Sequence, residues 1–182
     1  MNLSEAINQL KTTMDEEGIA AENGLGEELF LFATSLIPIV NIDILLIDKN
    51  CRFILAWRDD KYCGNGWHIP GGCIRLHEEI NTRIHACAID ELGTDVDYIS
   101  EPILIEEGIN HTTEIKERSH FISILYICKV NDLSKLRDVD GQHIVGHLKW
   151  FDKLPGNLVY VQDFYKDKWL EINNKMEELK NV

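Results

Sequence analysis

The sequence has little of what marks a secreted, membrane-spanning or nucleic-acid-binding protein. Its longest apolar stretch, residues 37 to 47, is broken by Asn41 and Asp43 and falls short of the roughly 18 to 20 residues that a membrane helix needs. Residues 1 to 18 are polar and acidic, unlike a signal peptide. The 18 Lys and Arg face 31 Asp and Glu, and a net charge of −13 repels nucleic-acid backbones. We therefore expect a cytoplasmic protein that binds neither membranes nor nucleic acids.

The cysteines form no recognisable pattern. They number five, and no C-x-x-C pair occurs among Cys51, Cys63, Cys73, Cys87 and Cys128. An odd number without that pairing argues against a zinc site and against a disulfide framework. We expect each of them to be a small buried hydrophobic side chain.

Length and periodicity predict one mixed α+β domain with helical additions at both ends. The chain has 182 residues, of which 45% are apolar, enough for one globular core. Apolar residues at helical spacing predict helices over 3–16, 27–36, 78–92 and 162–179. Strands are expected in a hairpin of residues 37–48 and 51–57, and near 67–70, 102–109, 120–130 and 147–151. These patterns divide the chain into an N-terminal helical extension (1–36), a central domain (37–155) and a C-terminal helix packed on it (156–182).

The helix predicted over residues 78–92 ends in two acids, Asp90 and Glu91. On a helical wheel, Glu91 falls among apolar residues such as Ile84 and Cys87, and the helix dipole disfavours an anion in the last turn by about 0.3 to 1 kcal/mol. A cation would remove both penalties, and Mg²⁺ prefers oxygen ligands. Without a cation, this turn is simply solvated. The Gly71-Gly72 pair ahead of the helix leaves a carbonyl accessible as a second ligand.

The same stretch resembles the Nudix box. Gly72, five residues, Glu78, seven residues and then the run from Ala86 to Thr94 match its spacing, as do the preceding WHIPGG and the ELG at its end. The resemblance implies a Nudix fold, a mixed β-sheet sandwiched between α-helices. It also implies hydrolysis of a nucleoside diphosphate linked to another group, with Mg²⁺ or Mn²⁺ as cofactor.

The box is reduced in this chain. Its Arg-Glu pair is replaced by Ala86-Cys87, and its penultimate Glu is the shorter Asp90. In the family the missing Glu is a metal ligand and the missing Arg orients a carboxylate. The site is therefore either inactive or works with fewer ligands.

One branch with a reduced box, the GDP-mannose mannosyl hydrolases, is similar outside the box as well, over about residues 37 to 154. The matching stretches are IPIVNIDILLI, LAWRDDKYCGNGWHIPGG and DGQHIVGHLKWF. This resemblance implies three catalytic residues: His143 as general base, Asp43 and Arg58. The metal ligands it implies are Gly72, Glu91, Gln142 and Asp90. The substrate-binding candidates are Arg58, Asp43 and Arg75, the last from the first turn of the helix.

We expect water to attack the anomeric carbon rather than phosphorus, and our hypothesis is that the metal then needs only to hold the departing nucleoside diphosphate. His143 would deprotonate the water, since histidine is easily poised as a base near neutral pH. His147 competes for this role. Asp43 could instead be a buried structural carboxylate, and Arg58 a surface arginine beside Asp59 and Asp60.

Three functions stay open. The first is hydrolysis of a GDP-mannose-like nucleotide sugar at carbon, giving free sugar and nucleoside diphosphate. The second is a conventional Nudix pyrophosphohydrolase that attacks phosphorus, using Asp90, Glu91 and perhaps Glu78. The third is a Nudix-fold binding or sensor module without catalysis, which the Ala86-Cys87 replacement favours. The apolar helix at 27–36 also makes a homodimer a candidate assembly.

Overall fold

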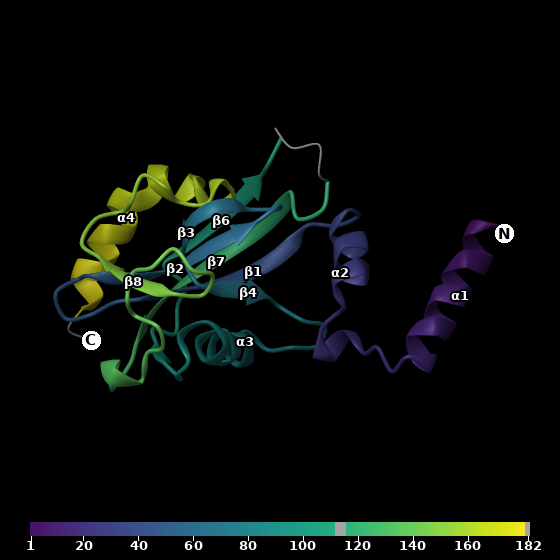
Figure 1. Cartoon of the computed structure of the whole chain (residues 1–182), viewed down its shortest axis with the longest axis horizontal. Helices are drawn as coiled ribbons and strands as arrows, with labels where there is room; N and C mark the ends of the chain where they lie inside the picture. The colour runs from purple at the N-terminus through teal and green to yellow at the C-terminus, as the bar shows by residue number, and fades with distance from the viewer. Residues whose placement is uncertain (112–115, 181–182) are drawn as a thin grey trace.

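Two β-sheets form the centre of the molecule in a computed structural model, which describes residues 1–111 and 116–180 (Figure 1). The larger sheet has the order β4-β1-β7-β5, with β6 also paired to β7, and the smaller sheet has the order β3-β2-β8. Strand β1 runs parallel to β7 and antiparallel to β4, so the larger sheet is mixed. The strands are β1 (Ile39–Leu46), β2 (Phe53–Asp60), β3 (Gly64–His68), β4 (Gly71–Cys73), β5 (Asp97–Tyr98), β6 (Leu104–Ile109), β7 (His120–Lys129) and β8 (Leu148–Phe151).

Helices cover the sheets from two sides, with α3 (Ile80–Cys87) on one side and α4 (Phe164–Leu179) on the other (Figure 1). Residues alternate in direction along a strand, so β1 contributes to both layers of the core. Its Ile44 packs in the cluster that contains α3, and its Leu45 in the cluster that contains α4. This arrangement confirms the predicted fold, a mixed sheet sandwiched between helices.

The predicted hairpin of residues 37–48 and 51–57 is wrong. Strand β1 belongs to the larger sheet and β2 to the smaller one, and in the described residues a single isolated bridge, Ile47 to Phe53, joins the two segments. Both strands are buried on both faces, so each can pair on two sides within its own sheet. The hairpin that does form joins β2 to β3.

The helix expected over residues 78–92 divides into two parts. The regular part, α3, ends at Cys87 and continues as a π-helical turn, η2 (Ala88–Leu92), which Gly93 closes with a left-handed φ of 80°. A π-helical turn is wider than an α-helical one, so it changes the direction of the side chains that follow Cys87. Asp90 and Glu91 lie in this turn.

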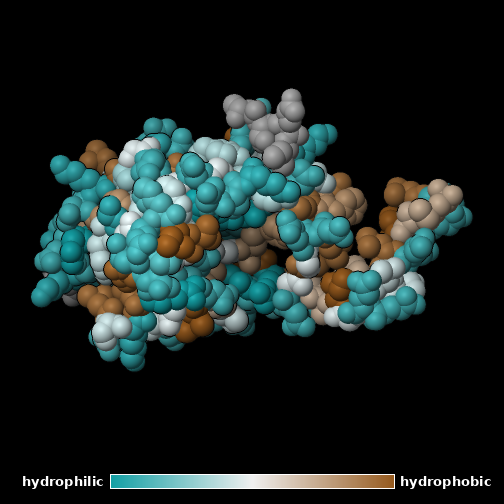
Figure 2. Space-filling view, viewed as in Figure 1, coloured by the Kyte–Doolittle hydropathy of each residue, from teal (hydrophilic) through white to brown (hydrophobic). Residues whose placement is uncertain are grey.

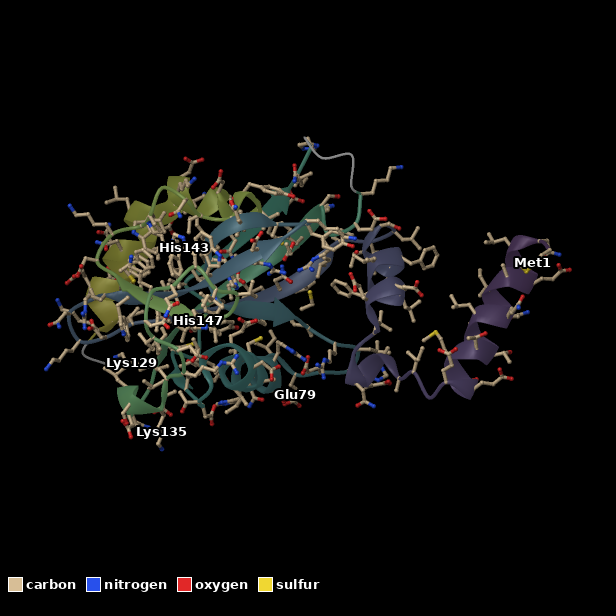
Figure 3. The ribbon with its side chains drawn as sticks, in the orientation of Figure 1. Met1, Glu79, Lys129, Lys135, His143 and His147 are labelled. Carbon is tan, nitrogen blue, oxygen red and sulfur yellow. The ribbon has the colours of Figure 1, made fainter. Side chains whose placement is uncertain are left out.

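The N-terminal helices stand apart from the sheets. Helix α1 (Leu3–Glu16), capped by Asn2 and Glu5, extends away from the body and buries none of its residues (Figures 1 and 3). The short helix η1 (Ala21–Asn23) and α2 (Glu27–Thr34) connect it to β1. Two further short helices are η3 (Leu133–Lys135) and η4 (Tyr160–Gln162). Within the described residues, no helix combines the length and the apolar character needed to cross a membrane.

Candidate active site

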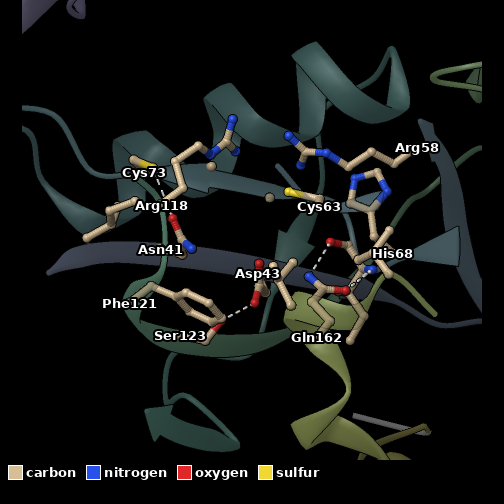
Figure 4. A pocket seen from close by; sticks show the side chains of 16 residues that line it. Asn41, Asp43, Arg58, Cys63, His68, Cys73, Arg118, Phe121, Ser123 and Gln162 are labelled. Carbon is tan, nitrogen blue, oxygen red and sulfur yellow. Dashed lines mark hydrogen bonds between the residues drawn. The ribbon is translucent and has the colours of Figure 1, made fainter. Parts of the chain in front are cut away.

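A small pocket of about 90 Å³ lies between the two sheets (Figure 4). Each sheet and the segment before β7 contribute to its wall, which includes Asp43, Arg58, His68, Gly72 and Arg118. The structure therefore brings Asp43, Arg58 and Gly72 together, as the sequence predicted for these three. His68 and Arg118 were not among the predicted site residues.

Asp43 is a buried carboxyl group in this pocket, with only 5% of its surface exposed. It accepts hydrogen bonds from the hydroxyl groups of Tyr165, at 2.7 Å, and Ser123. Burial raises its pKa to about 6, although both hydrogen bonds and the charge of Arg58 act in the opposite direction. This is the buried, hydrogen-bonded carboxyl group that the sequence allowed as a structural alternative, and its raised pKa at a pocket wall also makes it a functional candidate.

Two arginines make part of the pocket wall strongly cationic. The Arg58 guanidinium is paired with Asp60 (Nε to Oδ2, 2.5 Å), and the charge of Asp60 contributes to a raised Arg58 pKa, against the effect of burial. The Arg118 guanidinium lies 5.6 Å from the ring centres of both Phe30 and Tyr62. Figure 4 shows the two guanidinium groups on the same side of the pocket. Paired guanidinium groups are suited to binding phosphate oxygens.

His68 presents a neutral imidazole to the same pocket. Its Nδ1 lies 2.9 Å from the Ala56 carbonyl oxygen, and because a carbonyl only accepts, Nδ1 carries the proton. Burial, assisted by Arg58, lowers the His68 pKa to about 4, so Nε2 has a free lone pair at neutral pH. This Nε2 lies 4.0 Å from Oε2 of Glu91. Only a strand pattern marked His68 in the sequence, and nothing there indicated its contact with Glu91.

Glu91 lies beside the pocket, and its carboxylate is partly withdrawn from water. Burial raises its pKa, the neighbouring charge of Asp90 adds to this, and Arg58 and Arg137 oppose it. The side chain keeps 31% of its surface exposed. The backbone carbonyl of Asp90 accepts a hydrogen bond from Arg137, and Asp90 itself is exposed. Of the two acids in the π-helical turn, Glu91 is the one directed toward His68.

Cys87 stands where the Nudix box has a metal-binding Glu. A side-chain carbon on Gly72 would lie only 3.1 Å from its sulfur, so the thiol packs directly against β4. Burial raises its pKa to about 12, and the charges of Glu91 and Asp43 contribute in the same direction. The thiol is therefore protonated at neutral pH and is a poor metal ligand.

Few side-chain ligands for a metal are assembled here. Among residues 1–111 and 116–180, no group of three or more His, Cys, Asp and Glu side chains is arranged to hold an ion. Glu91, a carboxylate beside the pocket wall that burial leaves poorly solvated, suits a cation that keeps most of its other ligands as water or phosphate oxygens. Mg²⁺ is such a cation.

The first turn of the box is held by an ion pair that the sequence did not reveal. Arg83 donates two hydrogen bonds to Glu78, Nε to Oε2 at 2.8 Å and Nη2 to Oε1 at 2.7 Å; Arg83 is buried and Glu78 is partly buried. This pair lowers the Glu78 pKa. The arginine of the Nudix box would stand at position 86, where this chain has Ala86. Arg83 lies about one helical turn earlier on the same helix, and it orients the Glu78 carboxylate in place of that arginine. The signal for it was an arginine five residues after Glu78.

The remaining predicted site residues lie outside the small pocket. Arg75 lines a separate groove beside α2. Gln142 is exposed, and its side chain and backbone N–H both donate to Asp140, at 2.9 and 3.0 Å. The structure thus does not bring Arg75 or Gln142 to Asp43.

His143 is also kept away from the pocket. Its ring stacks on Trp57, with centres 3.8 Å apart and planes at 9°. Trp57 and Arg58 are consecutive in β2 and so point to opposite faces of the sheet, which places His143 on the face opposite Arg58. Its competitor His147 pairs with Asp140 at 3.0 Å, and both histidines lie in the region of β8 (Figure 3).

Comparison with solved structures identifies the fold. The chain is similar to a MutT Nudix hydrolase from Burkholderia pseudomallei, at 18% identity and a TM-score of 0.54, over 72% of this chain and 97% of that one. It is similar to a protein described as a possible asymmetric diadenosine tetraphosphate hydrolase from Jonesia denitrificans. The identity is 17% and the TM-score 0.57, over 78% of this chain and 98% of that one. It is also similar to a UDP-X diphosphatase, at 14% identity and a TM-score of 0.57, over 96% of this chain and 81% of that one. The protein has the Nudix fold.

Comparison by sequence gives no such match. No protein-family model matches the chain, and no curated protein does. The identities to the solved structures establish the shared fold alone, so the activity has to be argued from the site.

Proposed function

We propose that the protein is a Mg²⁺-dependent hydrolase of a nucleoside diphosphate sugar, GDP-mannose-like, which releases the sugar and the nucleoside diphosphate. The observation that carries this proposal is the pocket itself. It combines two guanidinium groups, Arg58 and Arg118, with a carboxyl group, Asp43, that titrates near neutral pH. Cationic groups that hold a diphosphate beside a carboxylate that can accept a proton are the requirements of such a hydrolysis.

The chain's own residues divide the work. Arg58 and Arg118 would bind the diphosphate oxygens and lower the free energy of the charge that develops on the leaving group. The hydrogen bonds from Tyr165 and Ser123 fix the Asp43 carboxyl group in one orientation. Ionised Asp43 would then accept a hydrogen bond from a sugar hydroxyl or from the attacking water.

Glu91 and the Gly72 carbonyl are the proposed metal ligands, with Asp90 and Gln142 as the further candidates from the sequence. When bound, Mg²⁺ would neutralise the charge of the departing diphosphate. The unprotonated Nε2 of His68 would orient the Glu91 carboxylate, either directly or through a water molecule.

His143 remains the proposed general base, and this role requires its segment to leave the position described above. The segment is bounded by Gly141 and Gly146, both with positive φ, and such hinges can absorb a large backbone change. Between them, Ile144 and Val145 are 49% and 63% exposed. Two exposed aliphatic side chains at the tip would gain buried area if the segment closed over a bound substrate.

The small number of available carboxylates in the box favours attack at carbon over attack at phosphorus. A conventional Nudix pyrophosphohydrolase uses several acids from the box. Here one is Cys87, neutral and buried, and Glu78 is fully engaged by Arg83. Attack at the anomeric carbon asks less of the metal, since it needs only to hold the leaving group.

The test is turnover of a panel of nucleotide sugars, GDP-mannose and GDP-glucose included, with ADP-ribose and dinucleotides alongside and Mg²⁺ or Mn²⁺ present. Products are identified by mass, with Glu91→Gln as the control. Free sugar and nucleoside diphosphate, absent in the control, support the proposal. Sugar phosphate and nucleoside monophosphate would identify a conventional pyrophosphohydrolase. Ligand binding without any turnover would identify a binding module, the function that Cys87 favours.

A further inference from the structure

A second and much larger hollow lies next to the pocket, between the N-terminal helices and the larger sheet. It has a volume of about 610 Å³. One wall comes from η1 and α2, and the other from the start of β1 and the segment between β4 and α3. Figure 2 shows the surface hollowed between α2 and the body, with hydrophobic side chains around it. We call it the α2 groove.

The α2 groove adjoins the active-site pocket. Ile39 and Cys73 line both. The pocket, at about 90 Å³, is much smaller than a typical small-molecule site of about 300 to 1,000 Å³. A nucleoside diphosphate sugar must therefore extend beyond it. The groove, at about 610 Å³, is within that range and lies beside the proposed diphosphate site.

The lining of the groove suits the nucleoside half of such a substrate better than the sugar half. Most of its side chains are apolar, including Leu25, Phe30, Ile37, Val40 and Leu76. A sugar placed there would leave most of its hydroxyl groups without hydrogen-bond partners, which is costly. A nucleobase is planar, has two apolar faces and needs few polar partners at its edge, which Arg75 can supply.

The groove and the diphosphate site are also tied together by Arg118. The Phe30 ring, which lines the groove, lies 5.6 Å from the Arg118 guanidinium, which lines the pocket. The Arg118 backbone N–H donates to the hydroxyl of Thr34, at 3.3 Å. A ligand bound against α2 would thus lie close to Arg118, the same arginine that is proposed to bind its phosphates.

We infer that the α2 groove binds the nucleobase and ribose of the substrate, so that the N-terminal extension determines which nucleotide is accepted. This inference rests on the proposed function, because it takes Arg58 and Arg118 to be the diphosphate site. It assigns a role to Arg75, whose guanidinium crosses toward Gly24 and forms no salt bridge in the described part of the chain. It leaves the sugar on the opposite side of the diphosphate, toward Asp43.

The test fills the groove and measures binding by calorimetry in the presence of Mg²⁺. Ala33→Trp places an indole in the groove from α2, and Leu76→Trp does so from the opposite wall, in case either variant fails to fold. Phe32→Trp is the matched control, since Phe32 lies on the same helix, is 55% exposed and does not line the groove. The probes are GDP, ADP and UDP, each compared with inorganic pyrophosphate.

We expect the unmodified protein to bind one nucleoside diphosphate at least about tenfold more tightly than pyrophosphate, as base stacking would provide. Either groove variant should remove this preference and leave pyrophosphate affinity within about twofold, and the control should alter neither. Nucleotide binding that survives both groove variants would overturn the inference and leave the proposed function standing. So would loss of a dimer on filling the groove, since α1 or α2 of a second copy would then be its occupant. Failure of the unmodified protein to bind either pyrophosphate or any nucleotide would overturn the proposed function itself.

Discussion

The two ends of the helix that follows Gly72 retain different parts of the Nudix box. At its first turn, Glu78 keeps its guanidinium partner, although the arginine now comes from position 83. At its end, Cys87 replaces one carboxylate, and a π-helical turn carries Glu91. The first turn therefore preserves the part of the motif that holds the loop in place. The last turn has a thiol where the motif has a carboxylate, which is the difference on which the proposed attack at carbon rests.

The largest expected effect is at the last turn. Glu91→Gln should lower kcat by about a thousandfold or more, because it removes the only carboxylate that faces His68 beside the pocket in the described residues. Cys87→Ala, one turn earlier, should change kcat by less than about threefold, since its thiol is neutral and buried. Steady-state kinetics on both variants make the comparison. Equal losses would show that the thiol takes part in the reaction.

Variants of the ion pair at the first turn should change the stability of the protein. Arg83→Ala should lower the free energy of unfolding by about 1 to 3 kcal/mol, because it leaves the partly buried Glu78 carboxylate without its partner. Urea denaturation measures this. The double variant Arg83→Ala with Ala86→Arg restores the family's arrangement and should recover most of the loss. A loss below about 1 kcal/mol in the single variant would mean that the pair does not hold the turn.

Asp43 should lower stability at neutral pH. Its pKa is higher in the folded protein, about 6, than the 3.8 of an unperturbed Asp, so the proton stabilises the folded state at low pH. That contribution is lost as pH rises from about 4 through 6, and amounts to about 3 kcal/mol as an order of magnitude. Asp43→Asn should therefore raise the free energy of unfolding at pH 7 to 8 by up to about this amount, and should change it little near pH 4. It should also lower kcat, by less than Glu91→Gln does.

The matched control for Asp43 is Asp48, whose hydrogen bonds with Arg52 and neighbouring backbone lower its pKa. Asp48→Asn should destabilise the protein at neutral pH and less so in acid, the opposite sign. Unfolding followed between pH 4 and 8 tests both variants. Equal pH dependence in the two would contradict the assignment of a costly charge to Asp43.

The smallest of these effects concerns the segment that carries His143. His143→Ala should lower kcat by about a hundredfold if the ring acts as base, and should change the free energy of unfolding by less than about 1 kcal/mol. His147→Ala, beside it, should retain most of its activity. Unchanged kcat in His143→Ala would show that stacking on Trp57 is the whole role of this ring.

Much of the fold was predictable because it depends on local periodicity. The helices near both ends, the strands around β6 to β8 and the spacing of the box all follow from apolar patterns and turn residues. Strand pairing was not predictable in the same way. An apolar run such as that of β1 is compatible with several partners, and the choice between β2 and β7 is made by the whole core.

The site was predictable where a motif fixed it and not where distant segments meet. Asp43, Arg58 and Gly72 were named from the sequence and lie in one pocket. Arg118 was missed because its segment has no alignable pattern, and it reaches the pocket through contacts with Phe30 and Tyr62. His68 was missed because its burial and its Glu91 contact are properties of the assembled core.

The most direct test of attack at carbon is to let the protein hydrolyse a nucleotide sugar that it accepts as substrate in water enriched in oxygen-18. Attack at the anomeric carbon places the label in the released sugar and leaves the nucleoside diphosphate unlabelled, which mass spectrometry resolves. The reduced box, with Cys87 neutral and Glu78 held by Arg83, predicts this result. Label in the phosphate and none in the sugar would contradict it and would mean that the remaining carboxylates suffice for attack at phosphorus.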